Sequence, residues 1–185
     1  SFFAGVDRLL FPEIVERRVI LTNASGVNST AVSEHAVGMM LALSRKLHFF
    51  VQNQMENRWK TGDAELLSQM EELSGKTVGI VGLGRIGGEI AKKAKCLGMG
   101  VLATRRNLSA PKPECVDRLV PAENLKPLLA ESDFVVLALP LTKDTEGMIG
   151  EAELKSMKNT GYLVNVSRGG LVEEEKLVQA LKEGW

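Results

Sequence analysis

The sequence predicts an α/β domain built on a doubly wound parallel sheet. Short apolar segments rich in β-branched residues alternate with segments of helical period. The apolar segments contain few polar residues, as expected for strands that are buried on both faces. The chain has 185 residues, with 44% hydrophobic and 25% charged residues, which is ordinary for one globular domain. Together these observations indicate a parallel sheet covered by helices on both faces.

Few helices or strands are predicted in the first third of the chain. Residues 18–22, Arg-Val-Ile-Leu-Thr, predict a short strand, and the Asn/Ser/Gly-rich residues 23–30 a connector. Apolar residues recur at helical spacing from 30 to 57, which predicts one long helix. Residues 61–74 are polar and predict a loop with a weak helical turn.

From residue 77 onward, predicted strands and helices alternate. The strands are expected at 77–81, 100–104, 134–139 and 162–166. The helices are expected at 85–97, 124–132, 151–157 and 173–182. Pro127 is compatible with a first helical turn, where N–H groups have no intrahelical partner. The chain opens in an apolar segment and stops where a strand would follow a helix, so we expect a domain truncated at both ends.

Composition argues against several functional classes. Lys plus Arg balance Asp plus Glu at 23 each, which argues against a general nucleic-acid or membrane-surface binder. Cys96 and Cys115 lie far apart, without CxxC spacing or clustered histidines, so we expect two reduced thiols and no metal site. No apolar stretch approaches 18 residues, and the expected compartment is the cytoplasm.

A glycine-rich turn carries the clearest functional signal. The strand 77–81 runs directly into Gly82-Leu83-Gly84-Arg85-Ile86-Gly87, and a helix follows. In such a loop the first glycine makes the tight turn, the second lets a pyrophosphate approach the backbone, and the third lets the helix pack on the strand. The helix start then offers free N–H groups and its positive dipole end. The sequence therefore predicts a Rossmann-type dinucleotide site; a purely structural turn is the alternative.

The end of the next strand indicates which dinucleotide is bound. NAD-binding domains usually carry an acid about 20 residues after the loop, bonded to the adenine ribose. Here that strand ends in Thr104, Arg105 and Arg106, with no acid. Guanidinium groups can bind a 2′-phosphate through charge-assisted hydrogen bonds, and a threonine hydroxyl can add to them. We expect NADPH, with NADH as second choice; the alternative is two solvated arginines on a loop.

At three places the sequence resembles the D-isomer-specific 2-hydroxyacid dehydrogenases, in particular the glyoxylate/hydroxypyruvate reductase branch. These are residues 73–87, the Ser132-Asp133 and Leu139-Pro140-Leu141-Thr142 segments with Thr145, and Asn165-Val166-Ser167-Arg168-Gly169. Their order and spacing together are specific, and the resemblance covers essentially the whole chain. The implied fold is the cofactor domain of such an enzyme.

The resemblance also implies a role for individual residues. Arg85 and Ile86 would meet the pyrophosphate, and Leu139 and Pro140 would line the adenosine side. Thr145, Val166 and Ser167 would face the nicotinamide half. Ala4 and Gly5 would bind the substrate carboxylate from another domain. Arg168 matches the catalytic arginine of the family.

Physical chemistry supports the assignment of Arg168 independently. It follows a predicted strand, at the carboxyl edge of a parallel sheet, where ligands of such folds bind. A guanidinium can anchor the carboxylate of a 2-oxo acid and polarise the adjacent ketone as hydride arrives. The alternative is an arginine that only satisfies nearby carbonyl groups.

The proton donor that such a reduction needs is not evident in this chain. The resemblance places a histidine and its glutamate partner downstream of residue 185. His35 and His48 both fall in the predicted 30–57 helix and are expected on its surface or at an interface. Glu173, Glu174 and Glu175 suit the first turn of a helix. We therefore expect this chain alone to bind cofactor without turnover.

Taken together, the sequence predicts an NADPH-dependent reductase of a small 2-oxo acid. Residues 1–24 would be the remnant of a substrate domain, and residues 25–185 an incomplete cofactor domain. The resemblance also implies that the protein forms a homodimer through residues 30–57. A non-catalytic dinucleotide-sensing or dimerisation module of the co-repressor type remains the alternative. A hydrolase with tightly bound NAD fits less well, because of the 165–169 segment.

Overall fold

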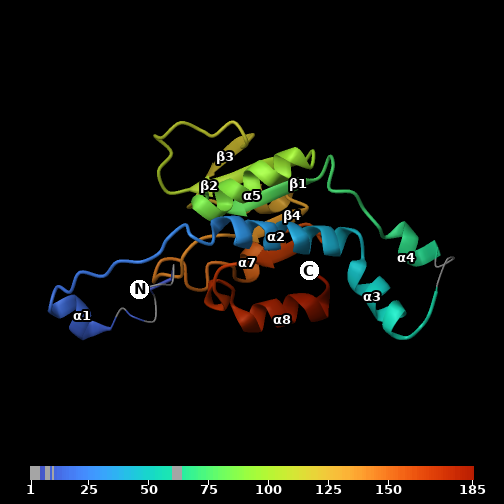
Figure 1. Ribbon diagram of the computed structural model, residues 1–185, viewed down its shortest axis with the longest axis horizontal. Coiled ribbons are helices and arrows are strands. Elements are labelled where there is room, and N and C mark those ends of the chain that lie inside the picture. The colour runs from blue at the N-terminus through green and yellow to red at the C-terminus, as the bar shows by residue number, and fades with distance from the viewer. Residues whose placement is uncertain (1–4, 7–8, 10, 60–63) are drawn as a thin grey trace.

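The computed structural model describes residues 5–6, 9, 11–59 and 64–185 and contains a five-stranded parallel sheet (Figure 1). The strands lie in the order β3-β2-β1-β4-β5, so the first strand in the sequence lies at the centre. All four pairings are parallel. The strands are β1 (Thr77–Val81), β2 (Gly100–Arg105), β3 (Arg118–Pro121), β4 (Phe134–Leu137) and β5 (Tyr162–Asn165). This confirms the predicted doubly wound parallel sheet.

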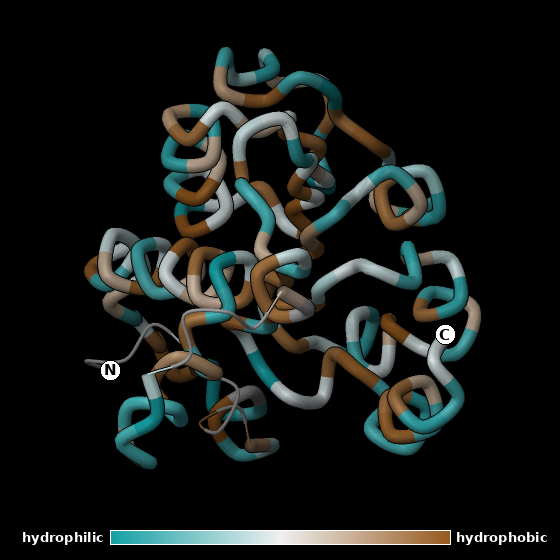
Figure 2. The backbone as a smooth tube through the Cα atoms, turned by 90° about the vertical axis from the view of Figure 1, so that its right-hand side faces the viewer, coloured by the Kyte–Doolittle hydropathy of each residue, from teal (hydrophilic) through white to brown (hydrophobic). Residues whose placement is uncertain are grey.

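Helices cover both faces of the sheet, and each face has its own apolar core. On one face α2 (Ser29–Ser44) and α5 (Arg85–Cys96) lie side by side. The other face is covered by α6 (Lys126–Glu131), α7 (Glu151–Ser156) and α8 (Glu174–Glu183). Alternate strand residues divide between the two cores, as strand geometry requires: Val78 and Ile80 face α2 and α5, whereas Val81 faces α6 to α8. Figure 2 shows hydrophilic and hydrophobic residues alternating along the outer helices.

Two differences from the predicted strands have simple causes. The predicted strand at 18–22 was wrong: these residues form no strand and are not paired in the sheet, and Ile20 is 90% exposed. The edge strand β3 was missed. It pairs with β2 from Leu102↔Arg118 to Arg105↔Pro121 and buries only one side chain, so it lacks the apolar signal of the central strands. Its terminal proline is tolerated because the strand lies at the sheet edge.

The predicted 30–57 helix is broken in two. Helix α2 ends at Ser44, and α3 (Leu47–Met55) begins after Lys46, which adopts left-handed backbone geometry with φ +53°. The two side chains at the break form hydrogen bonds with distant parts of the chain. Arg45 donates to the Glu71 carbonyl oxygen (3.4 Å), and Lys46 donates to the Tyr162 hydroxyl (3.1 Å). Tertiary contacts thus stop a helix that apolar periodicity alone would continue.

The remaining elements are short. The predicted weak turn within 61–74 is confirmed as α4 (Ala64–Ser68), whereas α1 (Pro12–Glu16) and the 3₁₀ turn Gly169–Leu171 were not predicted. Pro127 lies in the first turn of α6, as expected. Other helix and strand boundaries agree with the predictions within two residues.

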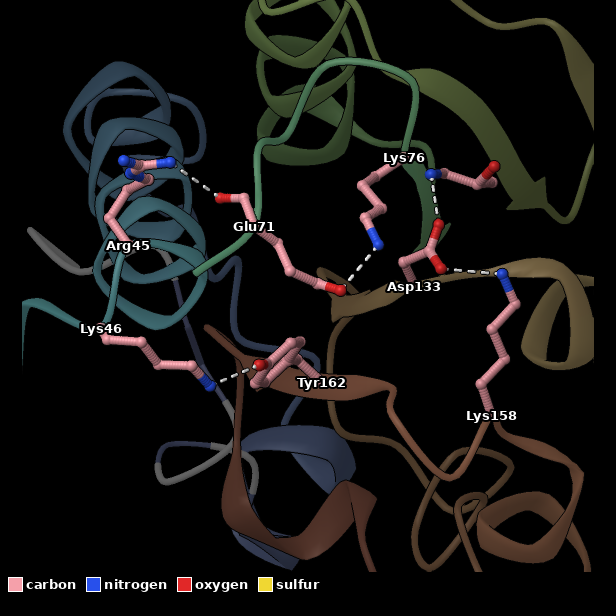
Figure 3. A network of polar contacts seen from close by, with 8 residues as sticks. Arg45, Lys46, Glu71, Lys76, Asp133, Lys158 and Tyr162 are labelled. Carbon is pink, nitrogen blue, oxygen red and sulfur yellow. Dashed lines mark hydrogen bonds and ion pairs between the residues drawn. The ribbon is translucent and has the colours of Figure 1, made fainter. Parts of the chain in front are cut away.

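A polar network joins the amino ends of the central strands (Figure 3). Asp133 accepts hydrogen bonds from the Thr77 main-chain N–H and the Lys158 ammonium, both at 2.8 Å. Burial raises the pKa of this carboxyl, but the bonds from Lys158 and Thr77 outweigh burial and hold the pKa below its usual value of 3.8. Asp133 therefore ties the starts of β1 and β4 to the turn before β5.

We expect replacement of Asp133 by alanine to lower the free energy of unfolding by about 1–3 kcal/mol at pH 7, because the main-chain N–H of half-buried Thr77 and the Lys158 ammonium lose a charged acceptor. A carboxyl whose pKa is lower in the folded than in the unfolded protein stabilises the fold at pH values above its unfolded-state pKa. This stabilisation is lost as the pH falls through the pKa of the folded state. The gap between wild type and variant should therefore close below pH 3.8. Urea unfolding at several pH values measures this. Glu131→Ala, which removes a half-exposed pair with Arg118, is the control; equal losses in both variants would contradict the prediction.

Candidate functional site

The candidate site lies at the carboxyl edge of the sheet, where the strand order reverses. Strand β1 pairs with β2 on one side and with β4 on the other. The chain builds outward from β1 to β3 and then returns to place β4 against β1. Loops that leave β1 and β4 at such a point diverge and form the crevice in which open α/β sheets bind ligands. The predicted glycine loop, residues 82–87, occupies this position.

Each glycine of the loop meets a different spatial requirement. Gly82 has φ +102°, and a Cβ there would lie 2.8 Å from the Cβ of Leu139, two residues after β4. At Gly87 a Cβ would lie 2.2 Å from the carbonyl oxygen of Gly82, so this glycine lets α5 pack against the loop. A Cβ at Gly84 would have no atom within 4 Å. Gly82 and Gly87 are thus required by close packing, whereas the backbone at Gly84 borders open space.

The start of α5 borders the open space beside Gly84. Gly84 is the N-cap residue, and no side chain caps the helix. The N–H groups of the first turn therefore remain for a ligand, together with the positive end of the helix dipole. Arg85 and Ile86 form this turn. These features fit the pyrophosphate of a dinucleotide.

The side chain of Arg85 lies on the connector before α2. Its guanidinium donates to the carbonyl oxygen of Ser25 and covers Gly26, where a Cβ would lie 2.3 Å from the arginine Nη1. The connector and the phosphate loop therefore meet at Arg85.

Thr104 is not placed as the sequence led us to expect. Its side chain is 2% exposed, and its hydroxyl accepts a hydrogen bond from the Gly82 N–H (3.1 Å). The expected contact with a 2′-phosphate needs a hydroxyl that faces solvent. Thr104 instead supports the glycine loop from within.

The two arginines after Thr104 differ in their surroundings. Arg105 donates to the carbonyl oxygens of Pro111 (3.1 Å) and Ala110, and its Nε is buried without a hydrogen-bond partner. Arg106 is exposed. Arg105 thus braces the loop after β2, while Arg106 already faces solvent. Both place positive charge where an acid is usual in NAD-binding domains.

The loop after β4 forms a compact turn around Thr145. The Thr145 hydroxyl donates to the Pro140 carbonyl oxygen (2.8 Å) and accepts from the Thr142 N–H (2.8 Å). Thr145 is 8% exposed, Leu139 is half-buried against Gly82, and Pro140 is exposed. Leu139 therefore lies against the glycine loop, and Thr145 holds together the turn that follows it.

Arg168 lies at the end of a second hydrogen-bonded turn, which follows β5. Asn165 accepts from the Ser167 N–H (2.9 Å) and donates to the Arg168 carbonyl oxygen (2.8 Å). The Ser167 hydroxyl donates to the Leu137 carbonyl oxygen of β4 (3.2 Å), and Val166 is half-buried. Arg168 is exposed at the carboxyl edge. Asn165 was not predicted as a site residue; an asparagine two residues before a turn N–H is the signal that would have indicated it.

The remaining predicted residues lie away from these turns or outside the described part. Ala4 lies outside the described residues, and Gly5 is half-buried. His35 and His48 are exposed on α2 and α3, which confirms their placement on helix surfaces.

Other features of the described residues do not suggest a second site for the same chemistry. An apolar cavity of about 750 Å³ follows the open edge of β5, and none of its lining residues belongs to the glycine loop. Within the described ranges, no His, Cys, Asp and Glu group could hold a metal ion. None of the described helices is long and apolar enough to cross a bilayer.

Comparison with known proteins points to one family. Residues 37–185 match the D-isomer specific 2-hydroxyacid dehydrogenase NAD binding domain. Over its whole length the chain is 41% identical to 56% of a glyoxylate reductase from Thermococcus gammatolerans. It is 37% identical over 97% of its length to 33% of a D-3-phosphoglycerate dehydrogenase from Archaeoglobus fulgidus. The chain thus spans about half the length, or less, of the curated relatives it matches.

Solved structures give the same picture. A D-lactate dehydrogenase from Aquifex aeolicus, complexed with NAD and lactic acid, superposes with a TM-score of 0.86 at 30% identity, covering 98% of this chain and 53% of that one. A glyoxylate reductase from Paecilomyes thermophila gives a TM-score of 0.85, also at 30% identity and with the same coverage.

Proposed function

Because the chain belongs to the D-isomer specific 2-hydroxyacid dehydrogenase family, we propose that it forms the cofactor-binding part of an NADPH-dependent reductase of small 2-oxo acids. The substrate would be of the glyoxylate or hydroxypyruvate type, and the product the corresponding 2-hydroxy acid, of D configuration where its C2 is a stereocentre. One observation carries this proposal: a glycine loop with an open backbone at Gly84 lies beside a strand that ends at Arg105, with Arg106 next in the chain. Residues 1–24 would belong to the substrate domain and residues 25–185 to the cofactor domain.

The turns at the carboxyl edge would hold different parts of the cofactor. The loop 82–87 and the first turn of α5 would bind the pyrophosphate through main-chain N–H groups. Leu139 and Pro140 would line the adenosine side, and Thr145, Val166 and Ser167 the nicotinamide side. Arg106 would reach the 2′-phosphate directly, because it is already exposed. Arg105 would first have to leave the carbonyl groups of residues 110 and 111. When bound, the nicotinamide supplies the hydride.

Arg168 would orient and activate the substrate. Its planar guanidinium matches the carboxylate of a 2-oxo acid, and a second N–H can polarise the ketone oxygen. As hydride reaches the carbonyl carbon, negative charge develops on that oxygen, and a fixed cation beside it lowers the barrier. Ala4 and Gly5 would bind the carboxylate from the other side.

The proposed reaction also needs a proton donor for the developing alkoxide, and the two exposed helix histidines are poor candidates. We therefore expect residues 1–185 to bind NADPH but not to oxidise it with glyoxylate or hydroxypyruvate. The full-length protein should oxidise it with one of these acids. Absorbance at 340 nm, against a control without substrate, tests both expectations. Steady turnover by residues 1–185 alone would contradict the need for a further acid, and an inactive full-length protein that still binds NADPH would favour a dinucleotide-sensing module.

A homodimer through the 30–57 region is also part of the proposal. No residue of α3 is buried, and its exposed apolar side chains include Leu47, Val51 and Met55, the last at 80% exposure. Apolar side chains gathered on one helix are typical of a protein interface. This observation supports an interface at α3 in particular.

A further inference from the structure

One residue of β2 holds two consecutive N–H groups of the phosphate loop. The hydroxyl oxygen of Thr104 accepts from the Gly82 N–H (3.1 Å), and its carbonyl oxygen accepts from the Leu83 N–H (2.7 Å). Thr104 also lies opposite Val81, the last residue of β1, in the β1–β2 register. The loop is therefore attached to its neighbouring strand at the point where it leaves the sheet.

The opposite side of the same turn is confined by the two residues that follow β4. A Cβ at Gly82 would lie 2.9 Å from the Ala138 carbonyl oxygen and 2.8 Å from the Leu139 Cβ. The turn at Gly82 is thus held between the ends of β2 and β4. Two residues further on, the backbone at Gly84 borders open space, and α5 begins at the next residue. Displacement of Gly82 would therefore move the N–H groups that face the ligand.

We propose that Thr104 is a positioning residue for pyrophosphate binding, acting through Gly82 and Leu83 without contacting the cofactor. The buried hydroxyl fixes the loop before the ligand arrives, so less conformational freedom is lost on binding. This role excludes Thr104 from recognition of the 2′-phosphate, which falls to the arginines after it. The inference rests on the proposed dinucleotide binding but is independent of whether NADPH or NADH is preferred.

The test uses residues 1–185 and two substitutions that separate the hydroxyl from its shape. Thr104→Val keeps the branched shape but removes the acceptor, and Thr104→Ser keeps the acceptor. We expect Thr104→Val to raise Kd about tenfold for both NADPH and NADH, the effect of one lost hydrogen bond of ordinary strength. The ratio of the two Kd values should stay at its wild-type value, and Thr104→Ser should bind both as wild type does. Binding of 2′-AMP, which lacks the pyrophosphate, should not change in either variant.

The outcomes separate positioning from direct recognition. Weaker binding of NADPH and 2′-AMP, with NADH unaffected, would show that Thr104 contacts the 2′-phosphate and would overturn the proposal. Unchanged affinities in Thr104→Val would overturn it as well, as would equal losses in Thr104→Ser. Thermal denaturation verifies folding, and Thr104→Ala provides a second variant without the acceptor should Thr104→Val not fold. A wild-type chain that binds neither dinucleotide would overturn the proposed function and this inference with it.

Discussion

Replacing Arg168 with glutamine is expected to lower kcat/KM for 2-oxo acid reduction in the full-length protein by about 100- to 1000-fold, the usual cost of removing one preorganised donor beside a developing oxyanion. Glutamine retains an N–H donor but lacks the charge and the second parallel hydrogen bond. The affinity for NADPH should change little, because the glycine loop and the end of β2 are untouched. Stopped-flow binding and steady-state oxidation of NADPH measure the two effects separately.

The control for Arg168 is another exposed arginine remote from the carboxyl edge. Arg118, at the start of β3, forms a surface ion pair with Glu131 at 2.5 Å. Arg118→Gln should keep wild-type kcat/KM, because Arg118 lies at the amino end of β3, away from the carboxyl edge. Loss of its surface ion pair should also change stability little. An Arg168→Gln enzyme with kcat/KM within threefold of the Arg118→Gln control would remove Arg168 from the reaction.

The second large effect is expected at the end of β2. Arg105→Asp should change the ratio of NADPH to NADH affinity by about 100-fold or more towards NADH, since charged hydrogen bonds contribute about 1.5–3 kcal/mol each. The carboxylate repels a 2′-phosphate and can accept hydrogen bonds from the free ribose hydroxyls. Titrations of the 185-residue chain with both dinucleotides measure the ratio.

Arg105 also braces residues 110 and 111, so its loss has a structural component. Arg105→Met removes the brace and the charge without adding an acid. It should weaken NADPH binding and leave NADH binding near its wild-type value. If both substitutions weaken the two dinucleotides equally, Arg105 acts only by supporting the loop.

The central sheet could be predicted because its strands are apolar throughout. Val78, Ile80 and Val136 are fully buried between two helical layers, and this double burial leaves a continuous signal in the sequence. Strand β3 and residues 18–22 show the limit of that signal. Pairing with β2, and not burial, makes β3 a strand, whereas the apolar 18–22 segment forms none.

The candidate site was predictable in position but not in side-chain direction. The three glycines mark a turn whose geometry follows from the backbone: Gly82 and Gly87 are closely packed, and Gly84 borders open space. Thr104 and Arg105 were expected to face a phosphate, yet one bonds the loop N–H and the other the 110–111 carbonyls. The partner of Thr104 lies 22 residues away in the sequence, and the partners of Arg105 lie in an irregular loop. No local sequence pattern therefore predicts these hydrogen bonds.

The cofactor site is best tested by a fluorescence titration of the 185-residue chain with NADPH and NADH, following energy transfer from Trp59 and Trp185. We predict saturable binding of both, with a lower Kd for NADPH, because Arg105 and Arg106 favour the 2′-phosphate over a free ribose hydroxyl. A lower Kd for NADH would contradict the cofactor assignment while leaving the glycine loop in place. Binding of neither would contradict the proposal that residues 82–87 form a dinucleotide site.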